Sequence, residues 1–255
     1  MVKLLDCTTR DGGHCTNWNY SDEYIFNLMS DIKIKDINFF EIGYRNYYDR
    51  GGKGAFYYCT PDLLKKFYDK KGDLNLGIMV DTKRYNETDF INGREDYVDF
   101  VRIATHPDKI NETLTIAESL NDKNYNVMVQ LMDITNLHDD HYNLLENWQN
   151  KNILKAIYLA DTYGIITAGG LETIYKKIKS IGYNNIGFHA HNKQQQALSN
   201  SVKAIELGAY SIDVVQNVAG INGGNLFYTE LIKLQKDTIR YVSNNSRFEK
   251  KEQGF

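Results

Sequence analysis

Short runs of apolar, often β-branched residues recur along the chain and alternate with longer amphipathic stretches. Short runs of this kind, bounded by polar residues and glycine, are typical of strands buried on both faces of a parallel sheet. The pattern predicts eight strands: Lys3–Cys7, Asn38–Ile42, Leu76–Val80, Phe100–Ile103, Asn126–Leu131, Ala156–Leu159, Ile186–His189 and Ser211–Val215.

The stretches between the strands have the apolar spacing of helices that pack one face on a core. Ser21 precedes the first of them and Gly208 follows the last, and these residue types are common start and stop signals. The predicted helices are Asp22–Ile32, Thr60–Lys70, Ile110–Asn121, His141–Lys151, Leu171–Ile181 and Gln195–Leu207.

Strands separated by helices must run parallel, because each return of the chain needs a crossover. Eight such units in 255 residues favour an α/β fold of the (β/α)₈ or TIM-barrel type, which takes about 250 residues. A doubly wound open sheet is the alternative, but no glycine-rich dinucleotide fingerprint follows the first strand. We expect residues 1–255 to form one catalytic barrel domain, with about 236–255 as a C-terminal helix or tail.

Composition narrows the location and the partners. The net charge is −3 and no basic stripe is visible, so we expect no nucleic-acid partner. No apolar run approaches the roughly 20 residues needed to span a bilayer, and the N-terminus lacks the apolar region of a signal peptide. The three cysteines have no CxxC spacing, which argues against a disulfide framework and a structural zinc site. We therefore expect a cytoplasmic protein without a membrane partner.

A metal site is predicted at the C-terminal ends of the strands, where barrels of this type carry their chemistry. His189 and His191 are two apart at the end of the seventh strand, so both imidazoles point to the same side. Asp11 follows the neighbouring first strand and adds a carboxylate, and Asn225 after the eighth strand adds an amide oxygen. Two histidines and a carboxylate leave open positions on a catalytic metal. The alternative is a pair of exposed or structurally satisfied histidines.

Arg10, His14 and Glu41 are the candidate catalytic residues beside this metal site. A guanidinium at Arg10 could stabilise an enolate or bind a carboxylate, and the alternative is an ion pair with Glu41. His14 follows a predicted Gly12–Gly13 turn and suits general acid or base chemistry, or else lies in a surface loop. Glu41 is expected to orient Arg10 or a metal ligand.

Three further residues at strand ends are interpreted as substrate-binding. Asp161 could equally orient a ligand or satisfy the barrel rim. The Tyr-rich segment from Tyr44 to Tyr58, with glycines in its middle, is typical either of a lid or of an extended loop. The substrate-binding candidates are Arg102, Thr105 and Asp161.

These segments together resemble the DRE-TIM metallolyases, a superfamily that includes 4-hydroxy-2-oxovalerate aldolases, hydroxymethylglutaryl-CoA lyases and isopropylmalate and homocitrate synthases. The resemblance is strongest to the 4-hydroxy-2-oxovalerate aldolases and runs from about Leu4 to Glu230. The matching motifs, in chain order, are LLDCTTRDGGH, VRIATH, YLADTYG, FHAHN, LSNSVKAIELGA and AGINGGN.

The resemblance implies that Asp11, His189 and His191 bind Mn²⁺ or Mg²⁺, with Zn²⁺ less expected, and that Asn225 matches a metal-side asparagine. It also implies that Arg10 steadies an enolate while His14 handles a proton. The implied activity is an aldolase that cleaves or forms a 4-hydroxy-2-oxo acid, with a 2-oxo acid and an aldehyde as small-molecule partners. Alternatives are Claisen-type chemistry on an acyl-CoA and a 2-oxo acid, a non-catalytic metal-binding barrel, and zinc-dependent hydrolysis.

The chain departs from the family after its eighth strand. The aldolases carry a C-terminal extension that docks an aldehyde dehydrogenase, and the synthases carry further C-terminal domains. The sequence ends soon after the barrel pattern, so we do not expect a dehydrogenase partner. Ile221 and Asn222 stand where the aldolases have a run richer in glycine and alanine, which leaves the substrate open. The sequence does not decide whether the protein forms a homo-oligomer.

Overall fold

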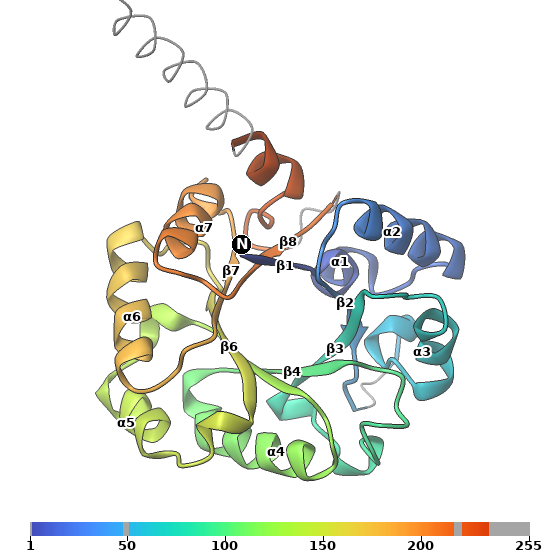
Figure 1. The fold of residues 1–255 in the computed structure, drawn as a ribbon, viewed down its shortest axis with the longest axis horizontal. Helices are drawn as coiled ribbons and strands as arrows, with labels where there is room; N and C mark the ends of the chain where they lie inside the picture. The colour runs from blue at the N-terminus through green and yellow to red at the C-terminus, as the bar shows by residue number, and fades with distance from the viewer. Residues whose placement is uncertain (1, 48–50, 217–220, 235–255) are drawn as a thin grey trace, which may run out of the picture.

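A computed structural model describes residues 2–47, 51–216 and 221–234. The predicted C-terminal helix or tail at about 236–255 lies outside the described residues. Eight strands close into an all-parallel barrel in the chain order β1 to β8, and Figure 1 shows helices α2 to α7 around the outside of this ring. The strands are β1 (Lys3–Asp6), β2 (Phe39–Tyr44), β3 (Asn75–Asp81), β4 (Phe100–Thr105), β5 (Val127–Leu131), β6 (Leu154–Asp161), β7 (Ile186–Ala190) and β8 (Ser211–Val214).

The (β/α)₈ prediction is therefore confirmed, and each predicted strand is present with slightly different ends. The described α-helices are α1 (Thr8–Thr16), α2 (Asp22–Ile34), α3 (Pro61–Tyr68), α4 (Ile110–Asp122), α5 (Asp139–Asn147), α6 (Ala168–Ser180) and α7 (Ala197–Glu206). Short 3₁₀ turns are η1 (Ala55–Tyr57), η2 (Thr82–Arg84), η3 (Glu87–Asp89), η4 (Pro107–Lys109), η5 (Ile134–Asn136) and η6 (Lys151–Ile153). No helix in these described ranges is long and apolar enough to cross a membrane.

Local side chains explain where several helices begin and end. The Ser21 hydroxyl accepts a hydrogen bond from the Tyr24 amide at the start of α2, and Thr60 and Thr167 cap α3 and α6 in the same way. Gly208, just after α7, adopts a φ of +91°, as expected for a residue that stops a helix. The predicted helix His141–Lys151 was too long, because Trp148 is already extended at the end of α5.

The largest correction concerns the segment after β1. The sequence suggested a strand end followed by a glycine turn, but Thr8–Thr16 forms helix α1, and neither Gly12 nor Gly13 has a positive φ. Gly13 is required for close packing instead, since a Cβ there would lie 2.0 Å from Nε1 of Trp18. That indole nitrogen donates to the carbonyl oxygen of Arg10 at 2.8 Å, which fixes the helix against the following chain.

Glycines on the inner face of the barrel make room for aromatic rings. A Cβ on Gly77 of β3 would lie 2.2 Å from the ring of Phe100, and a Cβ on Gly187 of β7 would lie 2.4 Å from the ring of Tyr158. Both rings are completely buried in the lower barrel interior, in one apolar cluster that also holds Leu5. These aromatic rings fill the barrel beneath its C-terminal mouth, so the site above them rests on a packed floor.

We predict that Gly187→Ala lowers the free energy of unfolding by about 1–3 kcal/mol, because the added methyl group overpacks the Tyr158 ring. The matched control is Gly169→Ala in α6, where a Cβ meets no atom within 4 Å. That substitution should be neutral or stabilise by up to about 1 kcal/mol through helix propensity. Urea denaturation measures both, and equal stability of the two variants would contradict this account of the barrel interior.

Candidate metal centre and active site

A pocket of about 350 Å³ opens at the C-terminal ends of the strands. Its wall combines residues from α1, such as Arg10, Asp11 and His14, with His189 and His191 from the end of β7. In a barrel of this architecture the C-terminal face is where strand ends and loops converge, which is why distant segments meet here.

Helix α1 directs the side chains of Arg10, Asp11 and His14 toward the pocket. Arg10 and His14 are four residues apart and Asp11 and His14 are three apart, so all three share a helix face. A regular strand would have sent Arg10 and Asp11 to opposite sides, and the helix removes that constraint. The unexpected helix therefore improves the convergence that the sequence predicted for these residues.

Asp11, His189 and His191 form a group whose ligand atoms all lie within 4.8 Å of one another. The Nε2 atoms of the two histidines face each other at 3.2 Å, and all three side chains are buried. Asn225 brings its amide within 3.5 Å of His189, and its backbone pairs with that of His191. The structure thus brings together all four residues that the sequence assigned to the metal.

The hydrogen bonds of the two imidazoles indicate that a cation fits between them. Nδ1 of His189 lies 2.9 Å from a carboxylate oxygen of Asp213, and Nδ1 of His191 lies 2.9 Å from the carbonyl oxygen of Ile221. Both Nδ1 atoms therefore carry the hydrogens, because their neighbours only accept. The two Nε2 lone pairs are then left facing each other, an arrangement that a bound metal ion would stabilise.

Two buried oxygens and two pKa shifts support the same conclusion. Oδ2 of Asp11 and Oδ1 of Asn225 have no hydrogen-bond partner, which leaves both available as ligands. Burial, together with the neighbouring His189, lowers the pKa of His191 to about 4, so this imidazole is neutral at pH 7. Burial alone would raise the pKa of Asp11, but Arg10 and the nearby histidines bring it below the usual range and keep it ionised. Neutral imidazoles and an ionised carboxylate are the forms that bind metals.

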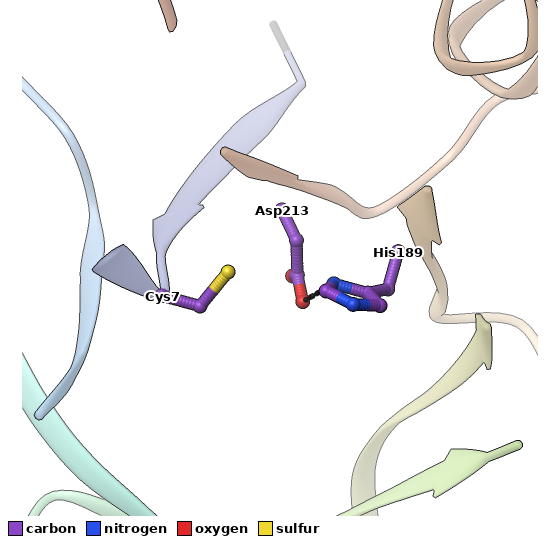
Figure 2. Close-up of side chains that lie close together, drawn as sticks. All are labelled: Cys7, His189 and Asp213. Atoms are coloured by element: carbon purple, nitrogen blue, oxygen red, sulfur yellow. Dashed lines mark hydrogen bonds and ion pairs between the residues drawn. The ribbon is translucent and has the colours of Figure 1, made fainter. Parts of the chain in front are cut away.

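Asp213, on the inner side of β8, was not identified from the sequence. The signal was an acidic residue inside the otherwise apolar run SIDVV, where a charge is unexpected without a buried partner. Figure 2 shows its carboxylate lying between Cys7 and His189 and hydrogen-bonded to the imidazole. It therefore fixes both the tautomer and the orientation of His189.

Cys7, His189 and Asp213 also lie close enough to be considered as metal ligands. This second group fits a metal less well than the first. Burial raises the pKa of the Cys7 thiol well above its usual range, and the thiol lies 3.6 Å from the carbonyl oxygen of Val214. The Asp213 oxygen that faces His189 also accepts from Arg102 at 2.8 Å. The second group is better described as support for His189.

A layer of buried charges lies directly below the metal ligands. Arg102 donates to both carboxylate oxygens of Glu41 at 2.6 Å and to Asp213 at 2.8 Å. Arg10 donates to Glu41 at 2.6 Å and also pairs with Asp11. The ion pair of Arg10 with Glu41, one of the two alternatives from the sequence, is thus present. The Nη2 atom of Arg10 makes no hydrogen bond, although it lies 3.9 Å from a carboxylate oxygen of Asp213.

Four residues assigned from the sequence lie outside the pocket wall. Glu41 and Arg102 are completely buried; Glu41 contacts Arg10, as expected from the sequence, and Arg102 contacts Glu41 and Asp213. Thr105 is buried, and its hydroxyl bonds to the backbone of His106. Asp161 accepts hydrogen bonds from the amides of Ile165 and Ile166 and holds the loop after β6. The residues that line the pocket here include Ala104 of β4, Gln130 of β5 and Thr162, which follows β6.

His14 lies beside an aromatic wall formed by Trp18 and Tyr44. The His14 ring lies 4.8 Å from the ring of Trp18 and 6.3 Å from that of Tyr44, measured between centroids. Residues 48–50 of the Tyr-rich segment lie outside the described residues. The later part of this segment is packed rather than open, because the Gly54 amide donates to the carbonyl oxygen of Asn17 at 2.7 Å and the Tyr57 ring lies 4.8 Å from that of Trp18 in a tilted arrangement.

Comparison with known proteins places this site in context. A family model described as HMGL-like matches residues 100–244. An oxaloacetate decarboxylase from Mycobacterium tuberculosis is 23% identical over 87% of the chain and 66% of its own length. A 4-hydroxy-2-oxovalerate aldolase from Carboxydothermus hydrogenoformans is 23% identical over 88% of the chain and 67% of its own length. The chain thus spans about two thirds of the length of these curated relatives.

A solved structure has the same fold. The N-terminal domain of a candidate aldolase from Bacteroides vulgatus superposes with a TM-score of 0.79 at 26% identity, over 92% of this chain and 79% of that one. The match agrees with the barrel architecture described above.

We predict that Asp213→Asn weakens Mn²⁺ binding about 10- to 100-fold, because an amide can no longer hold the His189 hydrogen as a carboxylate does. Titration followed by electron paramagnetic resonance measures the affinity, and circular dichroism checks the fold. The control is Asp108→Asn, an exposed carboxylate in η4 that removes the same charge. Wild-type affinity in a folded Asp213→Asn protein would show that this carboxylate does not position the ligand.

Proposed function

Because the chain belongs to the HMGL-like family, whose model matches more than half of its length, we propose that it is a divalent-metal-dependent aldolase. The reaction is the cleavage or formation of a 4-hydroxy-2-oxo acid, with pyruvate enolate and an aldehyde as the two halves. The observation that carries this proposal is the convergence of Asp11 and the two bare imidazole nitrogens beside the guanidinium of Arg10.

Mn²⁺ or Mg²⁺ would be held by Asp11, His189, His191 and the amide oxygen of Asn225. When bound, such an ion acts as a Lewis acid toward the carbonyl and carboxylate oxygens of a 2-oxo acid. Mixed imidazole and carboxylate ligands with open positions suit this use. The family is divalent-metal dependent, and the choice between the two ions is part of the proposal.

Arg10 stabilises the negative charge that develops on the enolate oxygen as the carbon–carbon bond breaks. Its side chain is held by Glu41 and Asp11, so it needs no rearrangement when that charge appears. The Nη2 atom, which makes no hydrogen bond within the protein, would supply the hydrogen bond to that oxygen. Burial would lower the pKa of Arg10, but the two carboxylates more than offset this effect and hold the pKa above its usual range. The guanidinium therefore stays charged throughout.

His14 transfers the proton at the 4-hydroxyl group. In the cleavage direction its imidazole accepts this proton, and in the condensation direction it returns the proton to the new alkoxide. Loss of hydration in the pocket lowers the pKa of His14, although the charge of Asp11 opposes the effect. The imidazole is therefore neutral at pH 7 and ready to accept a proton.

Decarboxylation of oxaloacetate is a second candidate, favoured by the similarity to the M. tuberculosis decarboxylase. Loss of carbon dioxide from oxaloacetate also leaves pyruvate enolate, so the metal ligands and Arg10 would have the same roles. The two candidates differ in the need for His14, because decarboxylation has no hydroxyl proton to remove. Condensation with an acyl-CoA stays a separate alternative, which release of a free thiol would reveal.

We predict that the wild-type protein with Mg²⁺ exchanges the methyl protons of pyruvate in D₂O and joins pyruvate to aldehydes. Mass spectrometry detects both the deuterated pyruvate and the new 4-hydroxy-2-oxo acids. Asp11→Asn and His189→Ala should abolish both reactions with the fold retained, because each removes a metal ligand. Oxaloacetate and acetyl-CoA in parallel reactions distinguish the alternatives. Wild-type rates in either variant would overturn the metal assignment.

His14→Gln should lower aldol turnover about 10²- to 10⁴-fold, the usual loss for a general base. It should leave oxaloacetate decarboxylation much less affected. In the wild type, turnover should fall as the pH drops through the pKa of His14, below 6.5, because a protonated imidazole cannot accept the hydroxyl proton. The pH profile of kcat/KM measures this limb. His138→Gln, an exposed histidine before α5, is the matched control, and an equal loss there would refute the role.

A further inference from the structure

Besides Arg10 and His14, three basic side chains line the pocket after β2, β3 and β4, next to the part of the barrel that carries the candidate metal ligands. The metal ligands come from β7, from α1 after β1, and from the segment after β8, which adjoin in the closed barrel. Lys53 follows β2, Arg84 follows β3 and His106 follows β4, and all three line the same pocket. These three residues therefore line a part of the pocket that the far end of a metal-bound substrate could reach.

Lys53 presents its charge without a carboxylate partner among the described residues. Its Nζ donates to the side-chain oxygen of Asn17 at 3.1 Å and lies 5.1 Å from the ring of Trp18 and 5.9 Å from that of Tyr57. The two rings also line the pocket, so the ammonium group is held at its wall by aromatic faces. Two hydrogens of this group are left for a ligand.

Arg84 adds a second cation with spare donors. Its Nη1 pairs with Asp81 at 3.0 Å, and its side chain is 47% exposed. A guanidinium carries five donor hydrogens, and this single contact leaves most of them open. The charges of both Lys53 and Arg84 contribute to lowering the pKa of His14. Both cations therefore lie within electrostatic range of the imidazole near which the aldehyde carbon would react.

The charges of the pocket wall are not balanced. Asp11 and Asp81 are the carboxylates that line it in the described part of the chain, and they face Arg10, Lys53 and Arg84. Asp11 is committed to Arg10 and to the metal site, and Asp81 to Arg84. If a neutral aldehyde filled the pocket, Lys53 would lie beside it without a counter-charge. An anionic oxygen at this end would supply one.

We propose that the aldehyde partner carries an anionic group, a carboxylate or a phosphate, and that Lys53 and Arg84 bind it. This inference rests on the proposed aldolase function. The carbon chain of the aldehyde packs against Trp18 and Tyr57, and its carbonyl carbon lies near His14. A volume of about 350 Å³ is at the small end of ligand pockets, which suits a short anionic aldehyde joined to pyruvate.

The test compares matched pairs of aldehydes with pyruvate and Mg²⁺. Glyceraldehyde 3-phosphate is paired with glyceraldehyde, and succinic semialdehyde with butanal, so each pair differs by the anionic group. The readout is the ratio of kcat/KM for the charged aldehyde to that for the neutral one. The proteins are the wild type, Lys53→Gln, Arg84→Gln and the control Lys83→Gln, whose side chain is exposed in the same 3₁₀ turn η2 and does not line the pocket.

The wild type should prefer at least one charged aldehyde over its neutral counterpart. The pair that shows this preference identifies the anion as a carboxylate or a phosphate. Lys53→Gln and Arg84→Gln should each lower the ratio roughly 10- to 100-fold, the usual effect of a lost hydrogen bond to a charged group. Lys83→Gln should keep the wild-type ratio. A wild type without preference, or an equal fall in Lys83→Gln, would overturn the anion site.

Deuteration of pyruvate by the wild type, measured without any aldehyde, separates the two failures. If deuteration occurs and the charged aldehydes are not preferred, the anion site is wrong and the aldolase proposal stands. If deuteration does not occur, the proposed function fails and the inference fails with it.

Discussion

The upper barrel depends on a buried set of charges that must be paired with one another. Glu41 lies at its centre and accepts from both Arg10 and Arg102, while Asp213 accepts from Arg102 and His189. None of these side chains has more than marginal contact with solvent. A buried charge without its partner costs several kcal/mol, so each member constrains the next. The positions of the pocket groups follow from this chain of ion pairs.

The same pairing prepares the site for chemistry. Asp213 holds the hydrogen of His189 on Nδ1, and the carbonyl oxygen of Ile221 does the same for His191. Both Nε2 atoms consequently carry no hydrogen, and the ligand atoms of the two histidines lie within 4.8 Å of that of Asp11. Glu41 in turn fixes Arg10, which needs no reorganisation when negative charge appears nearby. The barrel interior thus combines an aromatic floor, a charged middle layer and a metal-binding mouth.

The pocket wall divides into two parts with different charge. The side formed by β7, β8 and α1 gathers ligands for a cation, and the side formed after β2, β3 and β4 gathers cations of its own. His14 lies between them, against the rings of Trp18 and Tyr44. In the proposed reaction this division would give a 2-oxo acid and its aldehyde partner separate places, with His14 at their junction.

The sequence by itself determined the barrel, because the alternation of apolar runs and amphipathic stretches is a local pattern that fixes parallel strands. It also indicated which residues meet at the candidate metal site: His189 and His191 share a strand face by spacing alone, and Asp11 follows the adjoining strand. The helical form of Thr8–Thr16 was decided by tertiary packing, since Gly13 is needed to admit Trp18, a contact that local propensity does not encode.

Only the tertiary structure separated residues that touch the pocket from residues that support it. Arg102 was assigned to the substrate because it lies near the end of its strand, but its depth along the barrel axis depends on how the strands are staggered. Asp213 was missed because its partner, His189, lies on another strand. Only the closed barrel brings the two side chains to a similar depth. Sequence spacing gives the face on which a side chain lies, and the closed barrel decides its height and its neighbours.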